Sequence, residues 1–139
     1  MTVATYITDI KKIAIICGTG KEGKGLAYAW TKAGYQVLIG SRQMEKAVKA
    51  AEELNELLSN HGNYSKVIGK TNPEVCQMSD INVLTVPFSA HVDTLTALKT
   101  YLAGKILIDV TVPLVPPKVT RVQMPPAGSA AQEAQLVLG

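Results

Sequence analysis

The chain has 139 residues, of which 47% are hydrophobic and 18% are charged. This length fits one domain, and the composition is too apolar for a disordered segment. The formal net charge of +3 comes from 14 basic and 11 acidic residues that form no block of like charge, and the sequence holds only one Phe and one Trp. We therefore expect no nucleic-acid partner, because neither a basic tail nor a stacking platform for bases is present.

The two cysteines, Cys17 and Cys76, form neither a CxxC pair nor a cluster with histidine at metal-ligand spacing. Reduced thiols of this kind are typical of a cytoplasmic protein, and no metal site is expected. Residues 1–10 lack a basic start, and no run reaches the ~18 apolar residues of a membrane span. We interpret residues 1–10 as an N-terminal extension and expect no association with a membrane.

Five short apolar segments, several of them rich in β-branched residues, are predicted to be strands. The first, Lys11–Cys17, is stopped by glycines, a pattern typical of a strand buried on both faces of a parallel sheet. The predicted strands are 11–17, 36–39, 66–69, 81–86 and 105–109.

Helices are predicted between these strands and after the last one. Ser41 is expected to cap the second helix, and Asn72-Pro73 pairs a capping residue with proline at the first helical position. The predicted helices are 22–33, about 42–58, about 73–78, about 89–101 and 129–138.

Alternating strands and helices predict an α/β fold of the Rossmann type, a doubly wound parallel sheet with strand order 3-2-1-4-5. No clear sixth strand follows. Residues 11–139 are expected to form one domain, in which 112–128 is a proline-rich loop and 129–138 the last helix. A ligand is expected in the crevice between the first and fourth strands, where the strand order reverses.

The sequence Gly18-Thr19-Gly20-Lys21-Glu22-Gly23 leaves the first strand and enters a helix. In a dinucleotide-binding loop, the first glycine allows the tight turn, the second lets the pyrophosphate approach the backbone, and the third permits close packing. Backbone N–H groups at the helix start would bind phosphate. A glycine-rich turn without a ligand is the alternative.

The end of the second strand distinguishes NAD from NADP, since NAD sites usually place a carboxylate there for the ribose hydroxyl. Here the sequence is Gly40-Ser41-Arg42, with Lys46 one helical turn later. A hydroxyl and two cations favour a 2′-phosphate, and the absence of an acid argues against a methyltransferase. The alternative is that Ser41 only caps a helix and Arg42 is only a surface charge.

Four segments resemble the NADPH-dependent F420 reductases, also called F420H2:NADP oxidoreductases. They are GTGKEGKGLA (18–27), VLIGSRQMEKA (37–47), VLTVPFSAHVDTL (83–95) and GKILIDVTVPL (104–114). The resemblance implies that Thr19, Ser41, Arg42 and Lys46 hold the 2′-phosphate. The residues expected to bind NADP(H) are Gly18, Thr19, Gly20, Lys21, Glu22, Gly23, Ser41, Arg42, Lys46, Val86, Pro87 and Thr111.

The resemblance also implies direct hydride transfer between NADPH and a second redox carrier, which is F420, a flavin or a similar small molecule. Such a reaction needs no catalytic side chain, and we assign none. Asp109 is expected to hydrogen-bond within its loop, and His91 is interpreted as a surface or helix-start residue rather than a ligand contact. Val112 stands where many relatives have Asn, which affects the polar contacts at the nicotinamide end.

Family members continue for several dozen residues beyond the last predicted helix. The sequence leaves two interpretations open: a truncated cofactor-binding fragment of an oxidoreductase, incomplete for catalysis, or a stand-alone domain that depends on a partner. A non-catalytic NADP-binding or sensor module is the alternative function. A homodimer in which each chain covers the other's open edge is a further hypothesis.

Overall fold

The computed structural model describes residues 12–115 and 121–139. Its centre is a parallel sheet of five strands in the order β3-β2-β1-β4-β5, which confirms the predicted fold class and strand order. The strands are β1 Lys12–Ile16, β2 Gln36–Ser41, β3 Ile68–Thr71, β4 Ile81–Leu84 and β5 Ile106–Asp109. Pairing of β1 with both β2 and β4 places the reversal of strand order at β1.

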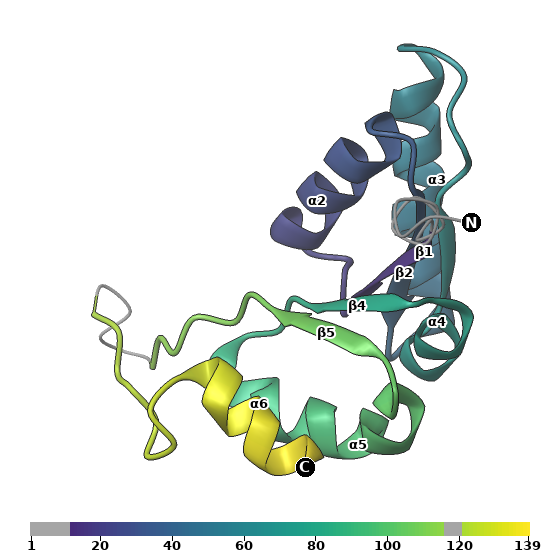
Figure 1. The fold of residues 1–139 in the computed structure, drawn as a ribbon. Coiled ribbons are helices and arrows are strands. Elements are labelled where there is room, and N and C mark those ends of the chain that lie inside the picture. The colour runs from purple at the N-terminus through teal and green to yellow at the C-terminus, as the bar shows by residue number, and fades with distance from the viewer. Residues whose placement is uncertain (1–11, 116–120) are drawn as a thin grey trace, which may run out of the picture.

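Helices cover both faces of this sheet (Figure 1). The helices are α2 Lys21–Lys32, α3 Met44–Ser59, α4 Asn72–Met78, the short 3-10 helix η1 Phe88–Ala90, α5 His91–Leu102 and α6 Ala130–Leu138. Helices α2 and α3 pack on one face, whereas α4, α5 and α6 pack on the other. The described part of the chain is therefore a three-layer α/β domain.

The first strand contributes to the core on both faces. Ile15 packs with Val37 and Ile39 of β2 against α2 and α3. Ile16 points to the opposite face, where Leu84 and Leu95 join it. Burial on both faces explains why the strand reads as a continuous apolar run rather than an alternating one.

The start of α3 differs from the predicted one. Gln43 occupies the N-cap position, whereas Ser41 is the last residue of β2 and pairs with Thr71. Ser41 therefore does not cap α3, because its backbone is still extended in the sheet. Its Oγ instead accepts a hydrogen bond from the N–H of Gln43 at 3.1 Å and closes the short turn between strand and helix.

Strand β3 starts two residues later than predicted. Val67 precedes it, and both of its backbone groups bond to the side chain of Asn55 in α3: the N–H donates to Oδ1 at 2.7 Å and the carbonyl accepts from Nδ2 at 2.9 Å. The side-chain amide replaces a strand partner at this position, so the sheet ladder starts at Ile68.

The proline-rich segment after β5 includes one antiparallel bridge, between Leu114 and Val122. Helix α6 follows, and the Oγ of Ser129 accepts a hydrogen bond from the N–H of Gln132 at 3.1 Å. The predicted N-terminal extension, 1–10, lies outside the described residues, as do 116–120. In the part of the chain that the structure describes, each helix is too short or too polar to cross a membrane.

Candidate functional site

The glycine-rich loop joins β1 to α2 at the carboxyl edge of the sheet. The N–H of Gly18 donates to the carbonyl of Gly40 at 3.0 Å, which ties the loop to the end of β2. Gly20 is the N-cap of α2, and its carbonyl accepts from the N–H of Lys24 at 2.9 Å. The loop predicted from sequence to bind pyrophosphate therefore lies beside the segment predicted to bind the 2′-phosphate.

The start of α2 is suited to an anion. No described side chain caps the helix at Gly20, so the first backbone N–H groups of the helix remain available. Lys21 and Glu22 are exposed in the first turn. The macrodipole and these N–H groups favour a phosphate at this position.

The three glycines of the motif are required for different reasons. A Cβ on Gly23 would lie 2.6 Å from the backbone of Gly18, and a Cβ on Gly18 would lie 2.8 Å from Cγ2 of Ile15. A Cβ on Gly20, by contrast, would meet nothing within 4 Å. Gly18 and Gly23 are therefore needed to form the loop, whereas the space above Gly20 is open, as a bound pyrophosphate would require.

The residues after β2 leave a cationic surface next to this loop. Arg42 is exposed between β2 and α3, and Lys46 is exposed in the first turn of α3. The end of β2, from which Arg42 follows, is tied to the glycine-rich loop by the bond between the Gly18 N–H and the Gly40 carbonyl. Thr19 is half-buried within the loop, and Ser41 is buried beside it.

Sequence reasoning missed the role of Asn72. It was expected to cap α4, but Thr71 takes the N-cap position and Asn72 is the first helical residue. Its buried side chain reaches Cys17: Oδ1 accepts from the Cys17 N–H at 3.0 Å, and Nδ2 donates to Sγ at 3.3 Å. Asn72 therefore fixes the residue from which the glycine-rich loop starts.

Cys17 is half-buried and adopts a left-handed backbone conformation with φ 56°. Burial raises the pKa of its thiol, while the hydrogen bond with Asn72 and the charge of Arg42 act in the opposite direction. A non-glycine residue rarely takes this conformation.

Thr85 connects the ends of β1 and β4. Its Oγ1 donates to the carbonyls of Ile16 and Cys17, at 3.0 and 3.1 Å. Strand β4 ends at Leu84, so the predicted strand end at Val86 was two residues too long. Val86 is buried in the core next to α5, whereas Pro87 is exposed after it.

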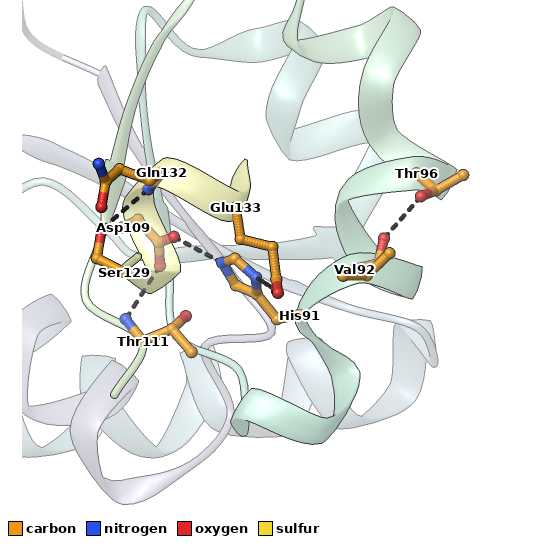
Figure 2. Close-up of polar contacts among 8 residues, drawn as sticks. All are labelled: His91, Val92, Thr96, Asp109, Thr111, Ser129, Gln132 and Glu133. Carbon is orange, nitrogen blue, oxygen red and sulfur yellow. Dashed lines mark hydrogen bonds and ion pairs between the residues drawn. The ribbon is translucent and has the colours of Figure 1, made fainter. Parts of the chain in front are cut away.

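Thr111, Asp109 and His91 form the far end of this edge (Figure 2). The N–H of Thr111 donates to Oδ1 of Asp109 at 3.0 Å, so the expected loop hydrogen bond of Asp109 is present. His91 is the first residue of α5, so the interpretation as a helix-start residue is confirmed, but it is fully buried, so the alternative of a surface residue is wrong. The physical reason is that carboxylates from β5 and α6 contact both of its ring nitrogens.

A five-stranded parallel sheet in this order, with a glycine-rich loop between its first strand and a helix, defines a Rossmann-type α/β domain. The sequence model of the family described as NADP oxidoreductase coenzyme F420-dependent matches residues 12–113. The chain belongs to this family.

Relatives support the same assignment. The chain is 39% identical to the F420-dependent NADP reductase of Methanocaldococcus jannaschii over 130 residues, which cover 91% of this chain and 58% of the relative. It is 45% identical to the enzyme of that name from Methanothermobacter marburgensis over 74% of this chain and 45% of the relative. The chain thus spans about half the length of these relatives.

Solved structures agree on the fold. A putative F420-dependent NADP reductase from Arthrobacter sp. FB24 superposes with a TM-score of 0.70 at 28% identity, over 91% of this chain and 57% of that one. The lactate dehydrogenase of Cryptosporidium parvum, solved with lactic acid and nicotinamide adenine dinucleotide, gives a TM-score of 0.64 at 22% identity, over 76% and 38% of the two chains. The second likeness concerns the fold alone.

Proposed function

We propose that this chain binds NADP(H) and takes part in hydride transfer between the nicotinamide and a second small redox carrier, which is coenzyme F420 or a flavin. One observation carries the proposal: the uncapped start of α2, the open space above Gly20 and the cations Arg42 and Lys46 adjoin at one edge of the sheet. An uncapped helix start suits a pyrophosphate. At the end of β2, Arg42 stands where an NAD site usually has an acid, which suits a 2′-phosphate, although Glu45 lies next to Lys46 in the first turn of α3.

The other half of the cofactor would lie across the crevice toward β4 and β5. A dinucleotide that starts at the α2 loop extends over the carboxyl ends of the strands in a fold of this kind. Val86, Pro87 and Thr111 follow β4 and β5 at that edge. Pro87 and Thr111 would contact the nicotinamide and its ribose, whereas Val86, whose side chain is buried in the core, would contribute its backbone. Hydride transfer between two rings depends mainly on their placement, so these residues would act by positioning rather than by acid–base chemistry.

The choice of cofactor tests the proposal directly. We expect NADPH to bind at least tenfold more tightly than NADH, because the 2′-phosphate gains charge-assisted hydrogen bonds worth about 1.5 to 3 kcal/mol. Arg42→Ala should remove most of this difference in a calorimetric titration, whereas Lys49→Ala, an exposed lysine further along α3, should leave it unchanged. Equal dissociation constants of the unaltered chain for NADPH and NADH would overturn the assignment of the 2′-phosphate site.

A second measurement concerns hydride transfer itself. When the chain is mixed with NADPH and oxidised F420, or with NADPH and a flavin, the absorbance of both cofactors should change as the carrier is reduced. The rate of this change measures hydride transfer. Tight NADPH binding without any reduction of either carrier would fit a non-catalytic NADP-binding or sensor module, and equally a cofactor-binding fragment that is incomplete for catalysis. The two experiments therefore separate binding of the cofactor from use of the cofactor.

The homodimer remains part of this proposal. Strand β5 is an edge strand whose Ile106 and Ile108 are 54% and 44% exposed, and a groove of about 640 Å³ opens between β5, α5 and α6. Two copies that cover these faces would bury the exposed apolar side chains. A concentration-dependent molar mass in light scattering would support the dimer, and a constant monomer mass would refute it.

The free thiols of Cys17 and Cys76 agree with a cytoplasmic location.

A further inference from the structure

His91 lies between two carboxylates that come from separate elements (Figure 2). Its Nε2 is 2.6 Å from Oδ2 of Asp109 at the end of β5, and its Nδ1 is 2.8 Å from Oε1 of Glu133 in α6. The imidazole has no exposed surface, and the side chains of Asp109 and Glu133 are only 6% and 18% exposed. The three residues, named here the His91 cluster, thus connect the starts of α5 and α6 to the end of β5.

The chemistry of the His91 cluster makes it rigid. A carboxylate oxygen accepts hydrogen bonds, so each ring nitrogen bonds to the carboxylate that it faces by donating to it. Removal of any one member would leave a buried charge or polar group without its partner. Phe88 of η1 also stacks on the ring, with centroids 6.1 Å apart. The ring is therefore held on both edges and on one face.

The His91 cluster continues into the loop after β5 through the second oxygen of Asp109. Oδ2 contacts His91, and Oδ1 accepts from the backbone N–H of Thr111 at 3.0 Å. The orientation of the carboxylate therefore sets the position of the Thr111 backbone. The Oγ1 of Thr111 is buried and has no hydrogen-bond partner among the described residues. A buried hydroxyl without a partner has unused hydrogen-bonding capacity, and a rotation of the Thr111 side chain would offer it to a ligand group.

We propose that His91 and Glu133 are positioning residues for the nicotinamide half of the NADP(H) site, and that they act through Asp109 to present the Thr111 hydroxyl to the nicotinamide carboxamide. The inference rests on the function proposed above. A primary carboxamide both donates and accepts, and a threonine hydroxyl can serve either of its atoms. The His91 cluster fixes the orientation of Asp109, and with it the position of Thr111, because a buried ring bonded at both nitrogens cannot rotate without breaking a hydrogen bond to a carboxylate.

Simple attachment of α6 to the sheet is the competing explanation, and it makes a different prediction. Attachment requires only the bond between His91 and Glu133, and its loss would disturb the domain without preference for one half of the cofactor. Selective loss of nicotinamide affinity would thus be specific to a positioning role.

Metal binding is not indicated, because the two carboxylates contact opposite nitrogens of one ring rather than converging on a point.

The test compares two ligands in calorimetric titrations of the chain. NADPH contains the nicotinamide, whereas adenosine 2′,5′-bisphosphate contains the adenosine and the 2′-phosphate but no nicotinamide. His91→Gln and Asp109→Asn should each lower the affinity for NADPH by about tenfold, which corresponds to the loss of about one hydrogen bond to a charged group. Both should leave the affinity for the bisphosphate within about twofold. Thr96→Val is the matched control on α5, because the exposed Thr96 hydroxyl bonds to the carbonyl of Val92 and to no other described residue (Figure 2).

Equal weakening of both ligands, or unchanged NADPH affinity in both variants, would overturn the inference in favour of simple attachment. Circular dichroism first establishes that each variant folds. Should the His91 and Asp109 variants fail to fold, Glu133→Gln decides the matter with the same two ligands, because Glu133 is the most exposed member and the variant keeps a hydrogen-bonding oxygen. Failure of the unaltered chain to bind the bisphosphate would instead overturn the proposed function and this inference with it.

Discussion

The side chain of Asn72 holds Cys17 at two points, with Oδ1 accepting from the Cys17 N–H at 3.0 Å and Nδ2 donating to Sγ at 3.3 Å. The two residues are 55 positions apart, so this contact fixes α4 against the end of β1. The same Oδ1 would lie 2.5 Å from a Cβ on Gly40, which shows how closely the amide fills the space between β1 and β2. The start of the glycine-rich loop thus depends on a side chain from another helix.

Replacement of Asn72 by alanine should destabilise the domain and the loop together. Asn72→Ala leaves the N–H of Cys17 without its acceptor, at a cost of about 2 kcal/mol in the free energy of unfolding. Urea denaturation would measure this loss, and Asn63→Ala, at an exposed position, is the control. We also expect weaker NADPH binding. A loss below about 0.5 kcal/mol, comparable to ordinary surface substitutions, would contradict the role assigned to Asn72.

The left-handed backbone of Cys17 should be measurable as strain. Cys17→Gly and Cys17→Ala both remove the thiol and its bond to Asn72, so the difference between them isolates the backbone. Glycine adopts φ 56° without the Cβ clash that costs about 1 to 2 kcal/mol, although it loses part of this gain through the entropy of the unfolded chain. The glycine variant should therefore be the more stable by about 1 kcal/mol in chemical denaturation. A more stable alanine variant would mean that the backbone is not strained at this position.

Gly20 and Gly25 offer a matched pair in the phosphate loop and α2. A Cβ on either residue would have open space within 4 Å, so Gly20→Val and Gly25→Val should both fold, as judged by circular dichroism. Only Gly20→Val should lower the affinity for NADPH, by more than about tenfold, because the pyrophosphate must approach the backbone at Gly20. Retained affinity in Gly20→Val, or an equal loss in both variants, would argue against a pyrophosphate at this position.

The buried thiol of Cys76 should make stability depend on alkaline pH. Burial raises the pKa of this thiol from 9.0 to about 11. Above pH 9 the unfolded chain loses the proton while the folded chain keeps it, so the contribution to stability is complete below pH 9 and is lost by about pH 11. The free energy of unfolding should fall by on the order of 2 kcal/mol more in the unaltered chain than in Cys76→Ala over this range. Parallel slopes for the two proteins would refute the buried-thiol explanation.

The sequence by itself determined the sheet and the position of the glycine-rich loop. Both depend on local patterns: apolar runs bounded by glycine, helical spacing of apolar residues, and three glycines at fixed distances between a strand and a helix. Such patterns act over a few residues, so one sequence suffices to recognise them. The order 3-2-1-4-5 followed because alternating strands and helices leave few topologies open.

Only the tertiary structure decided the ends of the elements and the polar contacts that support the site. Ser41 and Asn72 are both good capping residues by type, yet one remains in the sheet and the other turns to Cys17, because bonds to distant chain segments replaced the local ones. His91 is the sharper case. Its partners lie 18 and 42 residues away, on a strand and a helix that come together only when the sheet is complete. A histidine at a helix start is often solvated, and the burial of His91 depends on carboxylates that no local pattern can place beside it.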